Sequence, residues 1–313
     1  MANDVLFAPS FSERNLKVVI TLPNDVFINN SNVISIENAK IKASILLAGA
    51  SSLPIANISI YGLPKDTMDK LTVYQWNVNK YTNAQVTLYA NNNVVFNGTF
   101  QDAFADYSNM PDVPFNIHAT FMINNSLKNV SAISFNGPKK VIDIAQAIVK
   151  LMDNPPILID CISLKDSNGA FISTPILNDV CLTGSPLTML WRLQKMANIN
   201  ATLWASNDAD KGNIILTYIG ESRSDIIDIP LVTSETGLVG SPIRKNQVLW
   251  SLRVLYHPSY VPHGIIRIQS KLVPNGGDFY ATIQNMTYSL ESQTPNGQWF
   301  IDMDVWLKKD YVQ

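Results

Sequence analysis

The pattern that most constrains the fold is a segment of β-strand character that occurs twice. The residues Thr-apolar-Gln-Asx stand at 99–102 and again at 282–285, and a Pro-Asx turn follows each copy, at 111–112 and 295–296. After each turn the apolar residues occupy every second position, which is the period of a strand that buries one face. The sequence therefore predicts one amphipathic β-hairpin in two copies.

The strands that follow the two turns align with a constant spacing. The residues that share the apolar face are Phe115, Ile117, Ala119 and Phe121 in the first copy, and Trp299, Ile301, Met303 and Val305 in the second. Each member of the second set stands 184 positions after its counterpart (299 minus 115). The alternative is that any two amphipathic hairpins look alike. A true repeat would let one chain present two similar surfaces to a ring of higher symmetry than its own oligomer.

Further strand signals surround the repeat. β-rich segments bounded by turn residues stand at 16–22, 33–36, 40–47, 56–62, 84–89 and 94–100 in the first part of the chain, and at 226–231, 247–256, 264–270, 279–289 and 298–308 in the last part. One or two helical turns are expected over 63–71. These alternating segments predict β structure at both ends of the chain.

The middle of the chain changes to the period of a helix. Apolar residues recur at helical spacing over 141–152, and Pro155-Pro156 ends that pattern. A second helix should begin at Ser185-Pro186, because Ser caps helix N-termini and Pro suits the first helical position. The predicted fold class is therefore mainly β (α+β overall). The expected domains are a β-domain at 1–136, a small α/β domain at 137–221 and a second β-domain at 222–313.

The composition narrows the function. Charged residues make up 15% of the chain, against about 25% in typical domains, which favours a surface partly covered by neighbours in an assembly. The net charge of −2 excludes the basic excess that tight binding to the outside of a nucleic acid requires. No apolar stretch approaches the roughly 20 residues of a membrane span, and residues 1–15 carry no secretion signal. We therefore expect no membrane anchor.

A search for chemical motifs predicts no catalytic, cofactor-binding or metal-binding residues. The three histidines, His118, His257 and His263, lack the tighter Cys/His pairs of zinc sites. Phosphate-binding Gly-rich loops and the Gly-x-Ser-x-Gly motif are missing. The two cysteines, Cys161 and Cys181, are too few for a disulfide framework and predict buried, reduced thiols. His118 should face solvent or an interface, since it alternates with Ile117.

The carboxylates and the tryptophans each allow a second functional interpretation. Asp302 and Asp304 lie on the polar side of the last strand and should face solvent or a lumen, although a carboxylate pair for glycoside cleavage remains an alternative. Trp191, Trp204 and Trp299 are expected in the core, the alternative being a sugar-binding groove.

Four parts of the chain resemble the baseplate hub proteins of tailed phages. The parts are 56–63 with 68–71; 95–100 with 103–107 and 110–115; 143–145 with 184–186; and 234–242 with the strands up to Trp306. None of them is a catalytic signature, and their order and spacing over nearly the whole chain carry the resemblance.

The resemblance implies two tail-tube-like β-domains, of barrel or sandwich form, with the small α/β domain between them, and assembly as a homotrimer. Such a trimer is a pseudo-sixfold ring that adapts a sixfold tail tube to a threefold spike and lines the end of the DNA channel. The implied partners are the tail tube protein or a tube-terminating ring, the central spike protein, the tape measure protein, and genomic DNA that passes without specific binding. The implied location is the virion baseplate, after assembly in the host cytoplasm. The chain is short for the larger hubs and should lack their extra domains.

Assembly of such a ring would bury strand edges and apolar loop residues. The candidate interface residues are Phe104, Tyr107, Met110 and Pro111. The alternative is that they are ordinary core residues. Two other functions stay open: a receptor- or carbohydrate-binding module of a tail tip, and a peptidoglycan hydrolase.

Overall fold

The computed structural model describes residues 4–5, 14–23, 26–27, 30–49, 52–73, 84–165, 171–205, 212–225, 228–273 and 277–308. The chain is mainly β, and most of its strands belong to one large sheet that is antiparallel except at β16. No helix among the described residues is long and apolar enough to cross a membrane.

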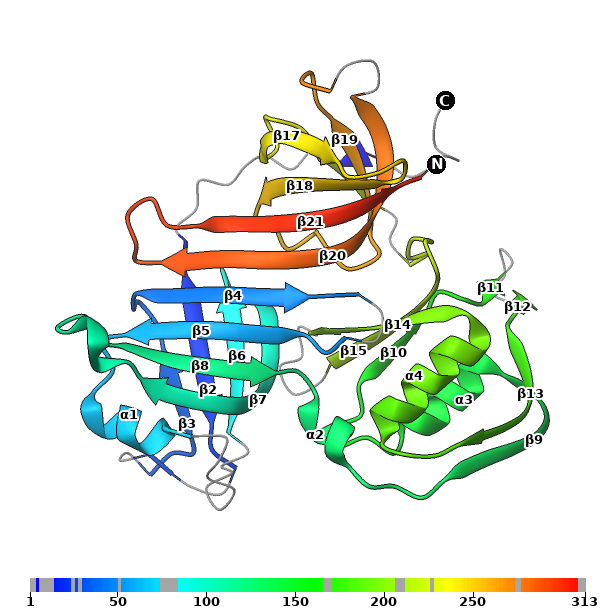
Figure 1. Ribbon diagram of the computed structural model, residues 1–313, viewed down its shortest axis with the longest axis horizontal. Helices are drawn as coiled ribbons and strands as arrows, with labels where there is room; N and C mark the ends of the chain where they lie inside the picture. Colours follow the sequence, from blue (N-terminus) through cyan, green and yellow to red (C-terminus); the bar gives the residue numbers. More distant parts are fainter. Residues whose placement is uncertain are drawn as a thin grey trace.

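The first β part is a strongly curled sheet. Its strands are β2 (Leu16–Thr21), β3 (Val33–Ile36), β4 (Ile41–Leu47), β5 (Ile55–Tyr61), β6 (Gln85–Ala90), β7 (Asn93–Ala105) and β8 (Pro114–Thr120). They lie in the order β3-β2-β6-β7-β8-β5-β4, and β2 and β6 pass behind β4, β5 and β8 (Figure 1). The apolar residues of every second position meet between these layers, for example Ile20, Ile58 and Leu88, all of them buried. The short helix α1 (Lys65–Leu71) covers one end and buries Met68 and Leu71.

The second β part repeats this connectivity. Its strands are β16 (Ile229–Val232), β17 (Leu238–Arg244), β18 (Leu249–Leu255), β19 (Ile265–Gln269), β20 (Asp278–Ser292) and β21 (Trp299–Leu307), and β1 (Asp4–Val5) pairs with β16. Taken in chain order, the six strands β16 to β21 correspond to β2, β4, β5, β6, β7 and β8. All five pairings of the first set recur in the second: β16–β19, β19–β20, β20–β21, β21–β18 and β18–β17. One direction differs, since β2 and β6 are antiparallel whereas β16 and β19 are parallel.

The two hairpins also share a β-bulge. In the first, Phe100 faces Ala119 and Asp102 faces His118, so that Gln101 is the extra residue. In the second, Ile283 faces Val305 and Asn285 faces Asp304, so that Gln284 is the extra residue. The same residue type therefore bulges at the same place in both copies of the predicted repeat.

The bulges correct the predicted alignment of the outer strands. Phe115 lies opposite Ala105 and Ile301 lies opposite Tyr288, and Ala105 and Tyr288 each stand four residues after the bulged glutamine. Gln101 and Gln284 are 183 positions apart, and so are Ala105 and Tyr288. Their partners in the outer strands therefore correspond, so Phe115 is equivalent to Ile301 and not to Trp299. The spacing is thus 186 (301 minus 115) rather than 184. Because both numbers are even, the same residues still face the core.

The two β parts join directly through β4 and β20. Seven residue pairs align along this antiparallel seam, from Ile41 opposite Ser292 to Leu47 opposite Met286. Figure 1 shows β5, β4, β20 and β21 side by side as one continuous sheet. Buried apolar residues of both parts form one core, so the seam is a packed part of the molecule.

The middle of the chain forms an α/β unit beside this sheet (Figure 1). Its elements are α2 (Ile123–Leu127), β9 (Ile133–Lys140), α3 (Val141–Val149), β10 (Ile157–Asp160), β11 (Leu164–Lys165), β12 (Phe171–Ser173), β13 (Ile176–Leu182), α4 (Pro186–Ala197), β14 (Ile199–Ala205) and β15 (Gly212–Tyr218). The predicted cap is present, because the Ser185 side chain accepts a hydrogen bond from the backbone N–H of Thr188 at 3.3 Å. β9 runs across the predicted domain boundary at 136/137, and the three-domain division stays a prediction.

Several elements differ from the prediction. The strands β1, β9, β10, β11, β12, β13 and β17 were not expected, and the helix predicted to reach residue 152 ends at Val149. β17 contains Gly240 and Pro242, which break the alternating pattern that marks a strand in sequence. Residues 226–227, at the start of a predicted strand, lie outside the described residues.

Candidate assembly interface

The four predicted interface residues gather at one end of the β7–β8 hairpin. In the loop, Tyr107 is 48% exposed and Met110 is 70% exposed, and Pro111 is also exposed. Phe104 differs from the prediction because it lies in β7 and not in the loop. It is half-buried, with its ring edge-on to that of His118 at 6.1 Å. Their role in an interface stays a prediction.

The loop that carries these residues is held in place at both ends. Asp106 caps a 3-10 turn over Tyr107–Asn109, since its carboxylate accepts hydrogen bonds from the backbone N–H and the hydroxyl of Ser108 at 2.9 and 2.6 Å. These bonds lower the pKa of the Asp106 carboxyl below its ordinary value. At the other end, Asp112 pairs with Lys40 at 2.5 Å. The exposed Tyr107 and Met110 side chains therefore project from an ordered loop.

A free strand edge lies at the far side of the sheet. Within the described part of the chain, β17 pairs with β18 alone. It exposes two apolar side chains, Val239 at 39% and Ile243 at 66%. Between them the register shifts, and Pro242 removes one backbone donor. A bulge and a proline are devices that blunt a strand edge against indiscriminate pairing.

One face of the continuous sheet is turned away from the core. A single cross-strand row on this face follows the register from β6 to β17: Gln85, Thr99, Thr120, Ile55, Leu46, Thr287, Asp302, Arg253 and Val239. Thr99 and Thr120 of this row are buried, and its other members are partly or fully exposed. We call this side the open face. Asp302 and Asp304 lie on it, as predicted, opposite the apolar face of β21.

Charges on the open face stand in opposite-sign pairs. Lys42 pairs with Glu291 across the β4–β20 seam at 3.6 Å, and Arg253 pairs with Asp302 at 2.7 Å. The predicted outward position of His118 is also found, with its Nδ1 atom 2.6 Å from a carboxylate oxygen of Asp102. Exposed pairs of this kind contribute little stability, but they cancel the local field.

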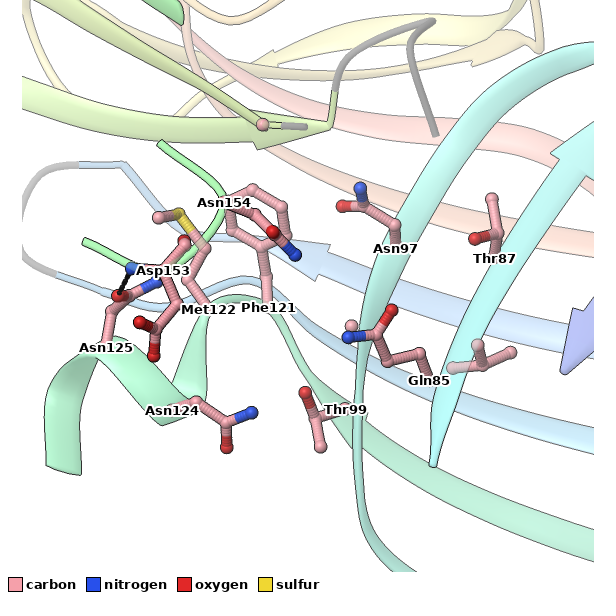
Figure 2. Close-up of a pocket in the computed structure, with 13 residues that line it drawn as sticks. Gln85, Thr87, Asn97, Thr99, Phe121, Met122, Asn124, Asn125, Asp153 and Asn154 are labelled. Carbon is pink, nitrogen blue, oxygen red and sulfur yellow. Dashed lines mark hydrogen bonds between the residues drawn. The ribbon is translucent and has the colours of Figure 1, made fainter. Parts of the chain in front are cut away.

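A small polar cavity of about 90 Å³ lies between β6, β7 and the α/β unit. Figure 2 shows amide side chains around it, and a hydrogen bond of 2.7 Å from the backbone N–H of Asp153 to Asn125. Among the described residues of its lining, Asp153 is the one carboxylate, and Lys128 pairs with it at 2.6 Å. This cavity therefore lacks the two nearby carboxylates that glycoside cleavage uses.

A second cavity, of about 230 Å³, is lined by aromatic side chains. The ring centroid of Tyr288 lies 6.4 Å from that of Trp204 and 6.0 Å from that of Tyr256. Asn93 and Asn213 add polar groups. Trp204 is half-buried and packs against the core while it also lines this cavity, and Trp299 is only 6% exposed and belongs to the core as expected. Trp191 is half-buried.

The two histidines of the last part, His257 and His263, each contact a neighbouring hydroxyl group. His263 is buried, and its Nε2 atom lies 2.7 Å from the hydroxyl of Thr202. Burial, together with the nearby positive charge of Arg223, lowers the pKa of His263 to about 4. His257 Nδ1 lies 2.7 Å from the hydroxyl of Ser259. The described residues contain no group of three His, Cys, Asp or Glu side chains that could hold a metal ion.

Both cysteines are reduced, as expected, but neither is fully buried. Cys161 is half-buried, and its Sγ atom lies 3.4 Å from a carboxylate oxygen of Asp225. Burial raises the pKa of the Cys161 thiol. Cys181 is exposed because it points outward from the β9–β13 ribbon, opposite Ser134, so the prediction that it is buried was wrong.

The fold is similar to three solved structures of tail-like proteins. The E. coli c3393 protein, a type VI secretion component described as structurally similar to the T4 bacteriophage tail proteins gp27 and gp5, matches with a TM-score of 0.59 and 11% identity over 87% of this chain and 74% of that one. A tail protein from Neisseria meningitidis MC58 matches with a TM-score of 0.61 and 7% identity over 93% of this chain and 96% of that one. The 43 kDa tail protein of prophage MuSo2 from Shewanella oneidensis matches with a TM-score of 0.56 and 10% identity over 94% and 96%.

No family model matches the chain, and no curated protein matches it by sequence. At the identities above, the structural likeness shows a shared fold. The chain has the mainly β fold of phage tail proteins, which confirms the fold class that the resemblance implied.

Proposed function

We propose that the protein is a structural hub of a phage tail baseplate, in which three chains form a ring with pseudo-sixfold symmetry. The observation that carries this proposal is the repeated strand order, joined by the β4–β20 seam. Two equivalent halves in each of three chains give six similar positions. A ring of this kind presents sixfold character to a tail tube on one side and threefold character to a spike on the other.

The open face suits the wall of a channel. Its cross-strand row holds mainly small polar and apolar side chains, and Lys42 and Arg253 are each matched by a carboxylate. Unpaired cations along the wall would neutralise phosphates and hold DNA in place. A wall with paired charges lets DNA slide through, so we place the open face toward the lumen.

The partners in this proposal are the tail tube protein or a tube-terminating ring, the central spike protein and the tape measure protein. DNA passes through the lumen without sequence-specific contacts. The protein acts in the virion baseplate by structure and without catalysis.

The mass of the purified protein in solution tests the proposal. A ring of three chains has a mass of about 104 kDa, three times the 34.7 kDa of one chain. Light scattering over a concentration series should give this mass, and a zymogram with host cell wall should show no lysis band. A protein that stays at the mass of one chain at all concentrations, or a clear lysis band, would contradict the hub.

The aromatic cavity favours one second candidate, a carbohydrate-binding module. Trp204 and Tyr256 with two Asn side chains offer the stacking surfaces and amides that sugars use. Titration calorimetry with cell-wall oligosaccharides tests it. Binding that is lost in Trp204→Ala would support this function, and the absence of binding would remove it.

A further inference from the structure

We propose that β17 of one chain packs against the β7–β8 hairpin end of the next chain, in the arrangement that β4 and β20 already make within each chain. This inference rests on the proposed ring, and it names the surfaces that join its subunits. The occupant of the free β17 edge is thus a second copy of the same protein.

The equivalence of β4 and β17 follows from their neighbours. Ile60 faces Phe115 on one side and Ile41 on the other. Val254 faces Ile301 on one side and Leu238 on the other. Since Phe115 and Ile301 are equivalent, Ile41 corresponds to Leu238. The next residues, Lys42 and Val239, then correspond as well, because each lies on the open face opposite β5 or β18.

The equivalence of β7 and β20 follows from the bulges. Gln101 and Gln284 differ by 183 positions, and the strands beyond them keep this spacing. The half of β20 that pairs with β4, Met286–Ser292, therefore corresponds to residues 103–109. These residues are the end of β7 and the 3-10 turn that carries Tyr107.

The β4–β20 pairing within one chain then predicts the contact between neighbouring chains. Within the chain, Lys42 of β4 lies opposite Glu291 of β20. One step further around the ring, the equivalent of Lys42 is Val239, and the equivalent of Glu291 is Ser108 of the next chain. Ring closure brings this pair together three times.

The side chains of the two surfaces complement each other. Val239 and Ile243 are 39% and 66% exposed on β17, while Tyr107 and Met110 are 48% and 70% exposed on the hairpin end. The equivalence places Val239 opposite Ser108 and Ile243 opposite Asp106 of the next chain, so the apolar side chains of β17 lie beside the turn that carries Tyr107. Exposed apolar side chains on two surfaces that a repeat brings together are what an obligate contact requires.

The backbone limits this contact to a short stretch. Val73 occupies the edge of β7 at Ala103, with two hydrogen bonds of 2.8 Å between their backbones. Pro242 and the register shift interrupt β17. The contact between chains therefore lies beyond Ala103, and side chains supply most of it. The same features keep the edges from pairing at random before the ring forms.

Crosslinking tests the surfaces. In a cysteine-free background, Cys161→Ser with Cys181→Ser, the pair Ser108→Cys and Val239→Cys is treated with a short bismaleimide. We expect bands of two and three linked chains on a denaturing gel. Each single variant should stay at one chain. The matched control pair, Val33→Cys with Val239→Cys, joins the 38% exposed edge residue of β3 to the same β17 site and should not crosslink.

The outcomes separate this inference from the proposed function. Suppose that the protein has the mass of three chains. If the control pair then crosslinks, or if Ser108→Cys with Val239→Cys does not, the ring stands and the assigned surfaces are wrong. Protein with the mass of one chain overturns the ring and the surfaces together.

Discussion

Gln101 and Gln284 occupy the same place in two hairpins, each being the one residue that bulges from a long strand between an apolar residue and an Asx residue. A bulge sets the register of everything that follows it, because a slip of one residue turns each side chain to the opposite face. The first prediction concerns the bulge in β20, since the residues after it pair with β21 and also form the β4–β20 seam.

Deleting Thr287, which follows the bulge, should destroy the fold. The deletion would move Tyr288 and Leu290 from the core to the open face, and these two side chains are at most 2% exposed. Loss of each such side chain from a core costs about 2–5 kcal/mol, so this variant should be unfolded in the absence of urea. Deleting Gln284 instead removes the extra residue and leaves Asn285 opposite Asp304 and Met286 opposite Met303, so this control should stay folded. Circular dichroism with urea titration checks both, and a folded Thr287 deletion or an unfolded Gln284 deletion would contradict the assigned register.

Equivalent core positions of the two halves should respond alike to truncation. Ile58→Ala and Leu252→Ala each remove a buried side chain from the strand that pairs with the outer hairpin strand, β8 or β21. Each should lower the free energy of unfolding by about 2–5 kcal/mol. The control is Ile55→Ala, which truncates a 40% exposed side chain of the open face and should cost about 0.5 kcal/mol or less. Tolerance of the truncation in one half alone would mean that the halves are not equivalent in packing.

His263 should make the protein less stable in mild acid. Burial and the charge of Arg223 hold its pKa at about 4 in the folded chain, against an ordinary value of 6.5. The unfolded chain therefore takes up the proton first, and the stability of the folded state falls as the pH drops from 6.5 toward 4. The loss should reach about 3 kcal/mol, since each pKa unit corresponds to 1.36 kcal/mol.

Urea titrations at pH 7, 5.5 and 4.5 measure this loss. His263→Gln removes the titrating group, so its free energy of unfolding should fall less over this range than that of the unmodified protein. Parallel pH profiles for the two proteins would show that His263 does not control the acid response.

A charge at the β17 edge should prevent assembly without unfolding the chain. Ile243→Glu places a carboxylate at a 66% exposed position, so the melting temperature should stay the same within a few degrees. In the ring this carboxylate would lie opposite the Asp106 carboxylate of the next chain, and like charges placed opposite each other repel, so light scattering should show the mass of one chain. The control is Leu272→Glu at a 70% exposed position outside the assigned surfaces, which should keep the mass of three chains. An intact ring in Ile243→Glu would argue against a role for β17.

Local sequence signals gave the elements that depend on local physics. Ser185 and Pro186 marked the start of α4 because capping and proline geometry act within one helical turn. The alternation in β8 and β21 marked their buried faces for a similar reason. β17 was not predicted, because Gly240 and Pro242 break the local strand pattern. Its pairing with β18 overrides that local pattern, which is a tertiary effect.

The candidate interface was predictable only in part. Tyr107 and Met110 were recognised as apolar residues of a turn, and they are exposed. The β17 side of the assigned contact, with Val239 and Ile243, depends on which strand edge stays free, and that follows from the whole strand order. The spacing of the repeat was wrong by two residues because the segment between the paired strands is three residues longer in the second copy, from Tyr288 to Ile301, than in the first, from Ala105 to Phe115, and the Pro-Asx turns do not mark where the pairing begins.

Cryo-electron microscopy of the purified chain tests the central claim most directly. We expect a threefold ring with an open channel, in which the two β halves of each chain superpose by a rotation close to sixfold and β17 meets the β7–β8 hairpin of its neighbour. Single copies, or a ring whose halves are not related by such a rotation, would contradict it.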